Sequence, residues 1–357
     1  MKRILLLTIV VGLIFVSCKN GGIKKVAVNG SINEIMIIMP TKLWDGNIGD
    51  TIKDFFRQPK LNLPQAEPTF SLVCLPHSHF KKNIKQHRNL LQIQISKDVK
   101  KAAIGFSESP WALTQKYFKI VAPDSTSFYK IFNKNKKRIM SVYLKAEQDR
   151  LITLIKKRAV SNIYYKFLNK YKVKLYLPSG FRLNKDTCNN FVWTSLETQR
   201  NSRGLIFYSE KYVSQYQFDF NIIIDNMNEQ LKKYIPGPTD STWMKINNDI
   251  PVSITKTNYQ EKYYSVLIKG LWMVENDFMG GPFELNAILD TRTNRILYFM
   301  SYVYAPDENK RNMSSEMDAI VNAIDLDWEI KEKTSKKDKD DKFIENSKSS
   351  TSNIKKK

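Results

Sequence analysis

The sequence predicts an α+β protein with mainly antiparallel sheets and flanking helices. Short apolar runs bounded by turn residues recur along the chain, as strands do in such folds. Residues 91–95 alternate apolar and polar side chains, which is typical of a half-buried antiparallel strand. Met313, Met317, Ile320, Val321 and Ile324 recur at intervals of three and four residues and indicate an amphipathic helix.

The remaining strands and helices are predicted from the same apolar runs and from the same spacing of three and four residues. Apolar runs predict strands at 34–39, 69–75, 90–95, 117–121, 172–177, 191–195, 204–208, 263–268, 283–289 and 295–304. The last two are joined by Asp290-Thr-Arg-Thr-Asn294, in which Asp and Asn favour a hairpin turn. Helical spacing predicts helices at 49–56, at 226–234 before Pro236, and at 139–171 as one long helix or two consecutive ones.

The first eighteen residues indicate export. Lys2 and Arg3 precede an apolar run at 4–16, which is shorter than the roughly 20 residues that a membrane-spanning helix needs. Phe15-Val16-Ser17-Cys18 resembles a bacterial lipobox, in which the cysteine thiol is joined to diacylglycerol. We therefore expect a signal peptide at 1–17 and a lipid-bearing tether at 18–30. The alternative is an ordinary signal peptide with an incidental Cys18.

Several acyl chains, palmitate among them, would make the attachment at Cys18 stable, since a single chain binds membranes only marginally. No acidic run follows Cys18, so the expected position is the outer membrane, facing the periplasm. Export would leave Cys74 and Cys188 in an oxidising space, where they either pair or remain separate, with Cys74 as a small buried apolar residue.

The net charge of +22 invites a nucleic-acid interpretation, which the composition does not favour. Most of the 57 basic residues are Lys, whereas Arg is the residue that reads bases and phosphates with two parallel hydrogen bonds. Part of the charge lies at 331–357, where ten Lys and five acidic residues accompany few apolar ones and predict a disordered basic tail. We expect no nucleic-acid partner.

The rest of the chain divides into two expected α+β halves, at 31–171 and 172–330. Residues 119–124 and 302–307 both run from a strand through Ala-Pro-Asp into a helical pattern, so the halves are either a diverged duplication or two instances of ordinary α+β connections.

Three stretches together resemble an uncharacterised family of Bacteroidota lipoproteins, known as domain of unknown function 4837. They are 43–49 with 63–70, 270–283, and 302–307 with Lys310-Arg311. The resemblance spans nearly the whole chain between tether and tail, and it implies a lipid-anchored envelope protein without an assigned activity or cofactor. Residues 171–183 followed by 191–193 are similar to the opening of PsbP-like α/β/α sandwich domains.

Catalytic motifs are scarce. The sequence lacks a Gly-rich phosphate loop, a Gly-x-Ser-x-Gly elbow and a His-Glu-x-x-His zinc motif. His77, His79 and His87 have a spacing that suits zinc or copper, but neighbouring Lys residues disfavour a cation, so we expect a solvated loop and no metal. No cofactor is expected either.

The segment around Trp272 is the better candidate site. Trp272, Asn276 and Asp277 would line a pocket beside a turn whose Gly280 and Gly281 adopt backbone angles closed to other residues. The competing interpretation, which we favour, is a tight connection between core strands with Trp272 buried. Glu67 is likewise expected to fix a turn.

Two functions follow from these patterns. The first is a non-enzymatic, membrane-anchored envelope protein that binds a protein or glycan polymer, and the alternative is an envelope enzyme that uses Asp277, Glu67 or the histidines. The first is preferred because the chain has few His and no nucleophile motif.

Replacing the expected lipid attachment residue tests the anchor. The Cys18→Ser variant should leave the membrane fraction on cell fractionation, because it lacks the thiol that carries the lipid. A variant that still sediments with membranes would show that the lipoprotein assignment is wrong.

Overall fold

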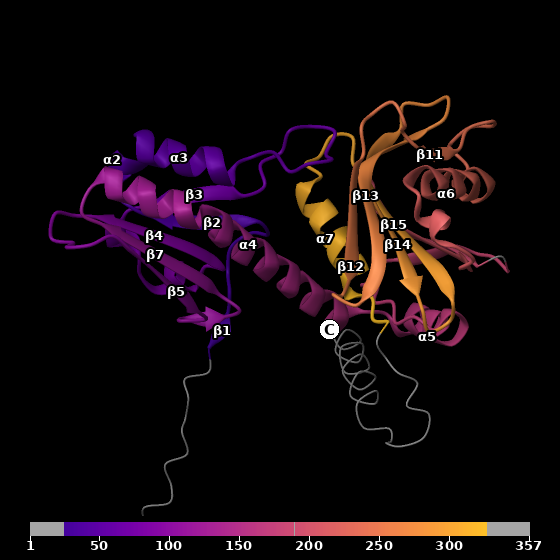
Figure 1. Ribbon diagram of the computed structural model, residues 1–357, viewed down its shortest axis with the longest axis horizontal. Helices are drawn as coiled ribbons and strands as arrows, with labels where there is room; N and C mark the ends of the chain where they lie inside the picture. The colour runs from indigo at the N-terminus through magenta and orange to yellow at the C-terminus, as the bar shows by residue number, and fades with distance from the viewer. Residues whose placement is uncertain (1–24, 189, 327–357) are drawn as a thin grey trace, which may run out of the picture.

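The computed structural model describes residues 25–188 and 190–326, which form a first domain at 25–158 and a second at 159–326 (Figure 1). Both combine strands with a few helices, and the larger sheet is antiparallel throughout, which confirms the predicted α+β class. Within the described residues, every helix is too short or too polar to cross a membrane.

The first domain is built on a five-stranded sheet in the order β3-β2-β4-β7-β5. Its strands are β2 (Glu34–Ile38), β3 (Ser71–Leu75), β4 (Asn89–Ile95), β5 (Ala103–Glu108) and β7 (Lys116–Ala122). The pairs β2–β3, β2–β4 and β4–β7 are parallel, and only β5 joins β7 in the antiparallel direction.

The prediction that residues 91–95 of β4 form an antiparallel strand is therefore wrong. The strand lies between two parallel neighbours, and its alternation arises because the two faces of the sheet are covered differently. Leu91 and Ile93 face a core of helices, whereas Gln92 faces loop residues and accepts a hydrogen bond from the Tyr117 hydroxyl at 2.5 Å. Alternation records the coverage of a strand and does not report the direction of its partner.

Helices cover one face of this sheet. They are α2 (Thr41–Trp44), α3 (Asn47–Phe56) and α4 (Ser125–Arg158), and the 3-10 turns η2 (His77–His79) and η3 (Lys82–Gln86) lie in the loops on the way to β4. Helix α4 begins at Asp124, whose carboxylate accepts a hydrogen bond from the Ser127 N–H at 2.8 Å. It runs from above the first sheet to the base of the second domain (Figure 1).

Two expected boundaries move. The expected boundary between the halves at 171/172 lies instead near Ala159. The second alternative for 139–171, two consecutive helices, is confirmed: α4 ends at Arg158, and α5 (Ser161–Tyr171) packs in the core of the second domain. The tether ends before residue 30, because β1 (Val26–Ala27) pairs with β6 (Ala112–Leu113). Cys18 and the predicted tail lie outside the described residues.

The second domain is built on an eight-stranded antiparallel sheet. The main path is β11-β13-β14-β15-β10-β9-β8, and β12 pairs with β13. The strands are β8 (Arg182–Asp186), β9 (Phe191–Glu197), β10 (Ser202–Lys211), β11 (Met244–Ile246), β12 (Ser253–Tyr259), β13 (Tyr263–Val274), β14 (Gly280–Asp290) and β15 (Arg295–Tyr304).

Helices lie on both faces of this sheet and make three layers. One core packs α5 and α7 (Arg311–Ala323) against it, and the opposite core packs α6 (Phe220–Tyr234) and the 3-10 turn η4 (Gln215–Phe218). Figure 1 shows α6 and α7 on opposite sides. In the first domain, by contrast, loops cover the second face of the sheet. That the two halves arose by duplication stays a prediction.

The prediction of a β-strand at 172–177 is wrong. The segment is extended and pairs only through a bridge from Lys174 to Asp325, so it forms no ladder. Val173, Leu175 and Leu177 are nonetheless buried beneath the sheet. An apolar alternation arises here because the chain crosses the core.

Gly280 and Gly281 allow close packing of strands, whereas the sequence predicted that they adopt backbone angles closed to other residues. Both lie in β14, and neither has a positive φ. A Cβ on Gly281 would lie 2.0 Å from the Val303 carbonyl oxygen, and one on Gly280 would lie 2.7 Å from the Trp272 carbonyl oxygen. The missing side chains allow neighbouring strands to approach.

We expect Gly281→Ala to destabilise the protein by about 1–3 kcal/mol, because the new methyl group collides with backbone that cannot move alone. Thermal unfolding of the purified protein would measure the loss. The matched control is Gly105→Ala, on exposed β5, where the nearest heavy atom to the new Cβ is 4.0 Å away. Equal melting temperatures for the two variants would contradict the close-packing role.

Candidate functional site

A pocket of about 710 Å³ opens in the second domain at one end of the sheet. Four segments meet there: the β9–β10 turn, the chain after α6, the β13–β14 hairpin and the end of β15. The pocket has aromatic walls and a polar rim. Its lining residues include Trp193, Glu197, Arg200, Asn201, Trp272, Met279, Tyr302, Tyr304, Asp307 and Glu308.

The aromatic walls hold one another in place through their polar tips. The Trp193 indole N–H donates to the Tyr302 hydroxyl at 2.9 Å, and the Trp272 indole N–H donates to the Val303 carbonyl at 3.2 Å. The Trp272 ring centroid lies 5.6 Å from that of Tyr302 and 6.2 Å from that of Tyr304. Burial raises the pKa of Tyr302 to about 12, so its hydroxyl remains protonated. The rings are therefore fixed before any ligand arrives.

The sequence pointed to this pocket through a different set of residues. Trp272 lines it but is only 4% exposed, so it forms the floor, and the buried interpretation holds. Asn276 and Asp277 shape the hairpin instead. Asn276 has a φ of 59°, and the Asp277 carboxylate accepts a hydrogen bond from the Met279 N–H at 2.9 Å. Phe278 at the tip is fully exposed, and Met279 returns to the pocket.

The rim was missed because its parts are far apart in sequence. Glu197 and Arg200 come from the β9–β10 turn, whereas Asp307 and Glu308 follow β15. The Asn201 amide nitrogen joins the two segments by donating to Glu308 at 2.7 Å. Individually exposed polar residues in turns carry no periodic signal, so no local pattern could have identified them.

The two domains are joined by a carboxylate that caps a helix. Glu67, on the long loop before β3, accepts hydrogen bonds from the backbone N–H groups of Lys310 at 2.6 Å and Arg311 at 2.9 Å, where α7 begins. Its side chain is buried. A negative charge at a helix N-terminus is favourable because the first N–H groups have no partner within the helix. Glu67 thus fixes the junction between domains, a larger role than the expected turn.

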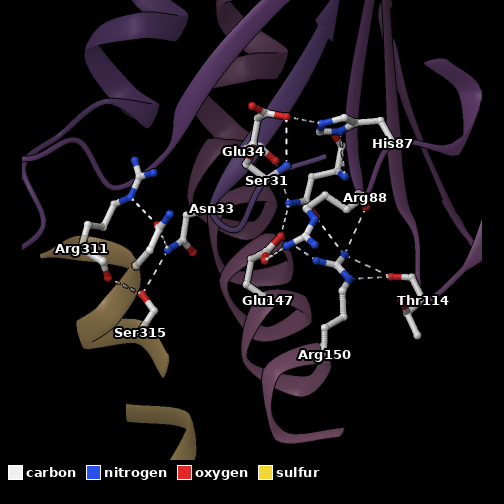
Figure 2. Close-up of polar contacts among 12 residues, drawn as sticks. Ser31, Asn33, Glu34, His87, Arg88, Thr114, Glu147, Arg150, Arg311 and Ser315 are labelled. Atoms are coloured by element: carbon white, nitrogen blue, oxygen red, sulfur yellow. Dashed lines mark hydrogen bonds and ion pairs between the residues drawn. The ribbon is translucent and has the colours of Figure 1, made fainter. Parts of the chain in front are cut away.

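Further contacts continue along α7. Figure 2 shows the Asn33 amide directed at α7, where its nitrogen donates to the Ser315 hydroxyl at 3.0 Å. The buried Arg311 guanidinium donates to the Pro68 carbonyl at 2.9 Å. Lys60 pairs with Asp318 at 3.3 Å, one turn further along α7.

A second pocket, of about 490 Å³, lies at this junction and contains four charged groups. Lys269 pairs with Glu284, and Lys60 pairs with Asp318. Burial and the neighbouring Asp318 raise the pKa of Glu284 to about 7, while Lys269 opposes the shift. Burial works against ionisation of Asp318, but Lys60 and Lys269 outweigh it and lower its pKa. Of the two neighbouring carboxyl groups, Glu284 is therefore the one that takes up a proton first as the pH falls.

Each of the three histidines contacts different residues. His77 Nε2 lies 3.0 Å from the Ile93 carbonyl, His79 contacts Ser78, and His87 Nε2 lies 2.7 Å from Glu34 (Figure 2). Nowhere in 25–188 or 190–326 do three or more His, Cys, Asp or Glu side chains form a group able to hold a metal ion.

A buried ion-pair network fastens α4 to the start of β4. The Glu147 carboxylate accepts from Arg88 at 2.7 Å, Arg150 at 2.6 Å and Asn89 at 2.6 Å (Figure 2). Arg150 also donates to the Thr114 carbonyl at 3.1 Å. In α/β folds ligands bind at the carboxyl ends of parallel strands, whereas this network lies at their amino ends, so we assign it to the fold.

The cysteines belong to different domains. Cys74 is a free thiol on β3, and burial raises its pKa to about 11. Cys188 is exposed just before β9. No disulfide joins Cys74 to Cys188 in the described part of the chain.

Two family models match the chain. Residues 159–323 match domain of unknown function DUF4837. The second domain belongs to the DUF4837 family. Residues 28–156 match another family, domain of unknown function DUF8532, so the stretches at 43–49 and 63–70 lie outside the DUF4837 match, and the predicted extent of the resemblance was too large. The two families meet where α4 ends.

Solved structures add little to this assignment. The Ran-binding protein Mog1p of Saccharomyces cerevisiae is 9% identical, with a TM-score of 0.28, over 43% of this chain and 89% of its own. A mutant of protein Mog1 is 10% identical, with a TM-score of 0.27, over 43% of this chain and 90% of its own. No curated protein matches the sequence.

The DUF4837 domain contains every residue that lines the aromatic pocket. Its stretches at 270–283 and 302–307, which carried the resemblance, supply Trp272, Met279, Tyr302 and Tyr304 to it. The pocket at the domain junction, by contrast, takes residues from both families.

Glu284 of the DUF4837 domain should make stability fall as pH rises. Its folded pKa of about 7 lies above its ordinary value, so its stabilising contribution is complete below about pH 4.5 and is lost as pH rises through about 7. We expect Glu284→Gln to flatten this decline, by at most about 1.4 kcal/mol per pH unit. Urea unfolding between about pH 5 and 8 would measure it.

The control for this series is Glu229→Gln, on the exposed face of α6. It should keep the pH dependence of the unchanged protein. If Glu284→Gln keeps it too, the raised pKa of Glu284 is not the cause of the decline.

Proposed function

We propose that this protein is a lipid-anchored cell-envelope protein that binds a partner protein or an envelope polymer in its aromatic pocket, without chemical conversion. The expected lipid at Cys18 would hold it at the outer membrane, facing the periplasm. The N-terminal pattern supports the anchor, and the pocket supports the binding.

The observation that carries this proposal is a preformed pocket with aromatic walls and polar edges. Binding sites for small molecules and short segments typically have volumes of about 300–1,000 Å³ and present mostly apolar walls with a few polar groups. The indole N–H groups of Trp193 and Trp272 already have acceptors, so a ligand meets the ring faces. Rigid aromatic side chains bind with a small loss of conformational entropy.

The enzyme alternative rests on a different pocket from the one expected. Asp277 is occupied in the hairpin turn, so it is a poor acid or base for the aromatic pocket. The junction pocket favours the alternative, because a carboxyl group with a pKa near 7 beside lysines is typical of acid–base sites. We rank it second because Lys60 and Lys269 are already paired with Asp318 and Glu284.

Photo-crosslinking in the native envelope tests the proposed site. A photoreactive phenylalanine analogue in place of exposed Gln199, at the rim, should capture a partner that mass spectrometry then identifies. The same analogue in place of Lys134, exposed on α4, should capture much less. Trp193→Ala should lower the yield from position 199 by about tenfold, as loss of an aromatic anchor does.

Met279→Ala provides a second variant if Trp193→Ala folds poorly, since Met279 lines the same pocket. Equal yields from positions 199 and 134 would contradict the site. Turnover of an envelope substrate by the purified protein, abolished by Glu284→Gln, would replace binding with the enzyme alternative.

A further inference from the structure

We propose that the aromatic pocket selects a cationic side chain, Lys or Arg, on a peptide segment of its partner. This inference rests on the proposed function and specifies the ligand chemistry at the same site. Three observations support it: the charge of the rim, the acceptors that the rim presents, and the ring faces behind them.

The rim is acidic on a protein that is strongly basic. Glu197, Asp307 and Glu308 line the pocket against the single guanidinium of Arg200, whereas the whole chain carries +22. Glu197 and Asp307 are exposed. Within residues 25–188 and 190–326, none of the three carboxylates forms an ion pair. A local excess of negative charge attracts a cation and repels an anionic polymer.

The rim also presents hydrogen-bond acceptors. The Glu197 carboxylate accepts a hydrogen bond from the Ser195 hydroxyl at 3.0 Å, and Glu308 accepts one from the Asn201 amide nitrogen. An ammonium or guanidinium group carries hydrogen-bond donors and no acceptors, so it matches the carboxylate acceptors that Glu197 and Glu308 present at the rim.

The walls suit the rest of such a side chain. Lys and Arg have apolar stems that pack on apolar surface while their charged heads stay at a polar edge. Trp193 and Tyr304 are half-buried, so part of each ring remains accessible, and ring faces attract a cation within about 6 Å. A neutral glycan would stack on the rings and donate hydroxyl hydrogen bonds to the carboxylates, but it would leave their negative charges uncompensated.

Peptide binding to the purified full chain tests this inference. Two peptides would be compared by calorimetry, identical except that one carries a central Lys and the other an Nε-acetyl-lysine. We expect the Lys peptide to bind about fivefold or more tightly than the acetylated one. Raising NaCl from about 0.05 M to about 0.5 M should weaken the Lys peptide alone, because salt screens the rim.

A pair of double variants assigns the effect to the rim. Asp307→Asn with Glu197→Gln should remove the preference for Lys. The control, Asp225→Asn with Glu229→Gln, also removes two negative charges, but from exposed positions on α6. It should preserve the preference for Lys. Melting temperatures equal to that of the unchanged protein would show that both double variants fold.

Equal affinity for the two peptides would overturn the inference, and so would equal loss in both double variants. In either case a crosslink from position 199 would leave the proposed function standing. Absence of that crosslink, with a clear preference for Lys, would instead count against the envelope partner and leave the cation selectivity in place.

Discussion

The arrangement of the two domains depends on the hydrogen bonds from the N–H groups of Lys310 and Arg311 to the carboxylate of Glu67. They place α7 where it contacts α4 and the second sheet, and where Arg311 donates a hydrogen bond to the Ser71 hydroxyl at the start of β3 at 3.2 Å. A helix begun by a side chain from another domain cannot shift along its axis without losing its cap, and a lost cap costs about 1 kcal/mol. Asn33 and Lys60 then reach the following turns of the same helix.

The junction and the aromatic pocket use opposite physical strategies. At the junction, partly buried Lys60 and Lys269 are paired with Asp318 and Glu284, which fixes the domains but leaves little charge for a ligand. In the aromatic pocket the walls satisfy their own polar tips, and the charges at the rim remain exposed. The first is suited to holding parts of one molecule together, and the second to receiving another molecule.

Local pattern predicted the elements of the fold better than their partners. The strands near 34–39, 191–195 and 295–304 were found because burial on one or both faces leaves an apolar run. The parallel ladders of β4 were not, because strand direction depends on the connections. Trp272 marked the correct pocket, but Asn276 and Asp277 proved to shape the turn, and the partner of Glu67 is 243 residues away. Contacts at such separation leave no trace in a local window of sequence.

The position of α7 near the end of the described chain has a consequence for assembly. Glu67 and Lys60 are synthesised early, yet the helix that they hold follows the last strand of the second sheet. The loop at 57–70 therefore waits, with its carboxylate in water, until the second sheet and α7 have formed. The capping hydrogen bonds at the junction can therefore form only after α7 has been synthesised. A chain interrupted before α7 would lack the helix that both domains contact.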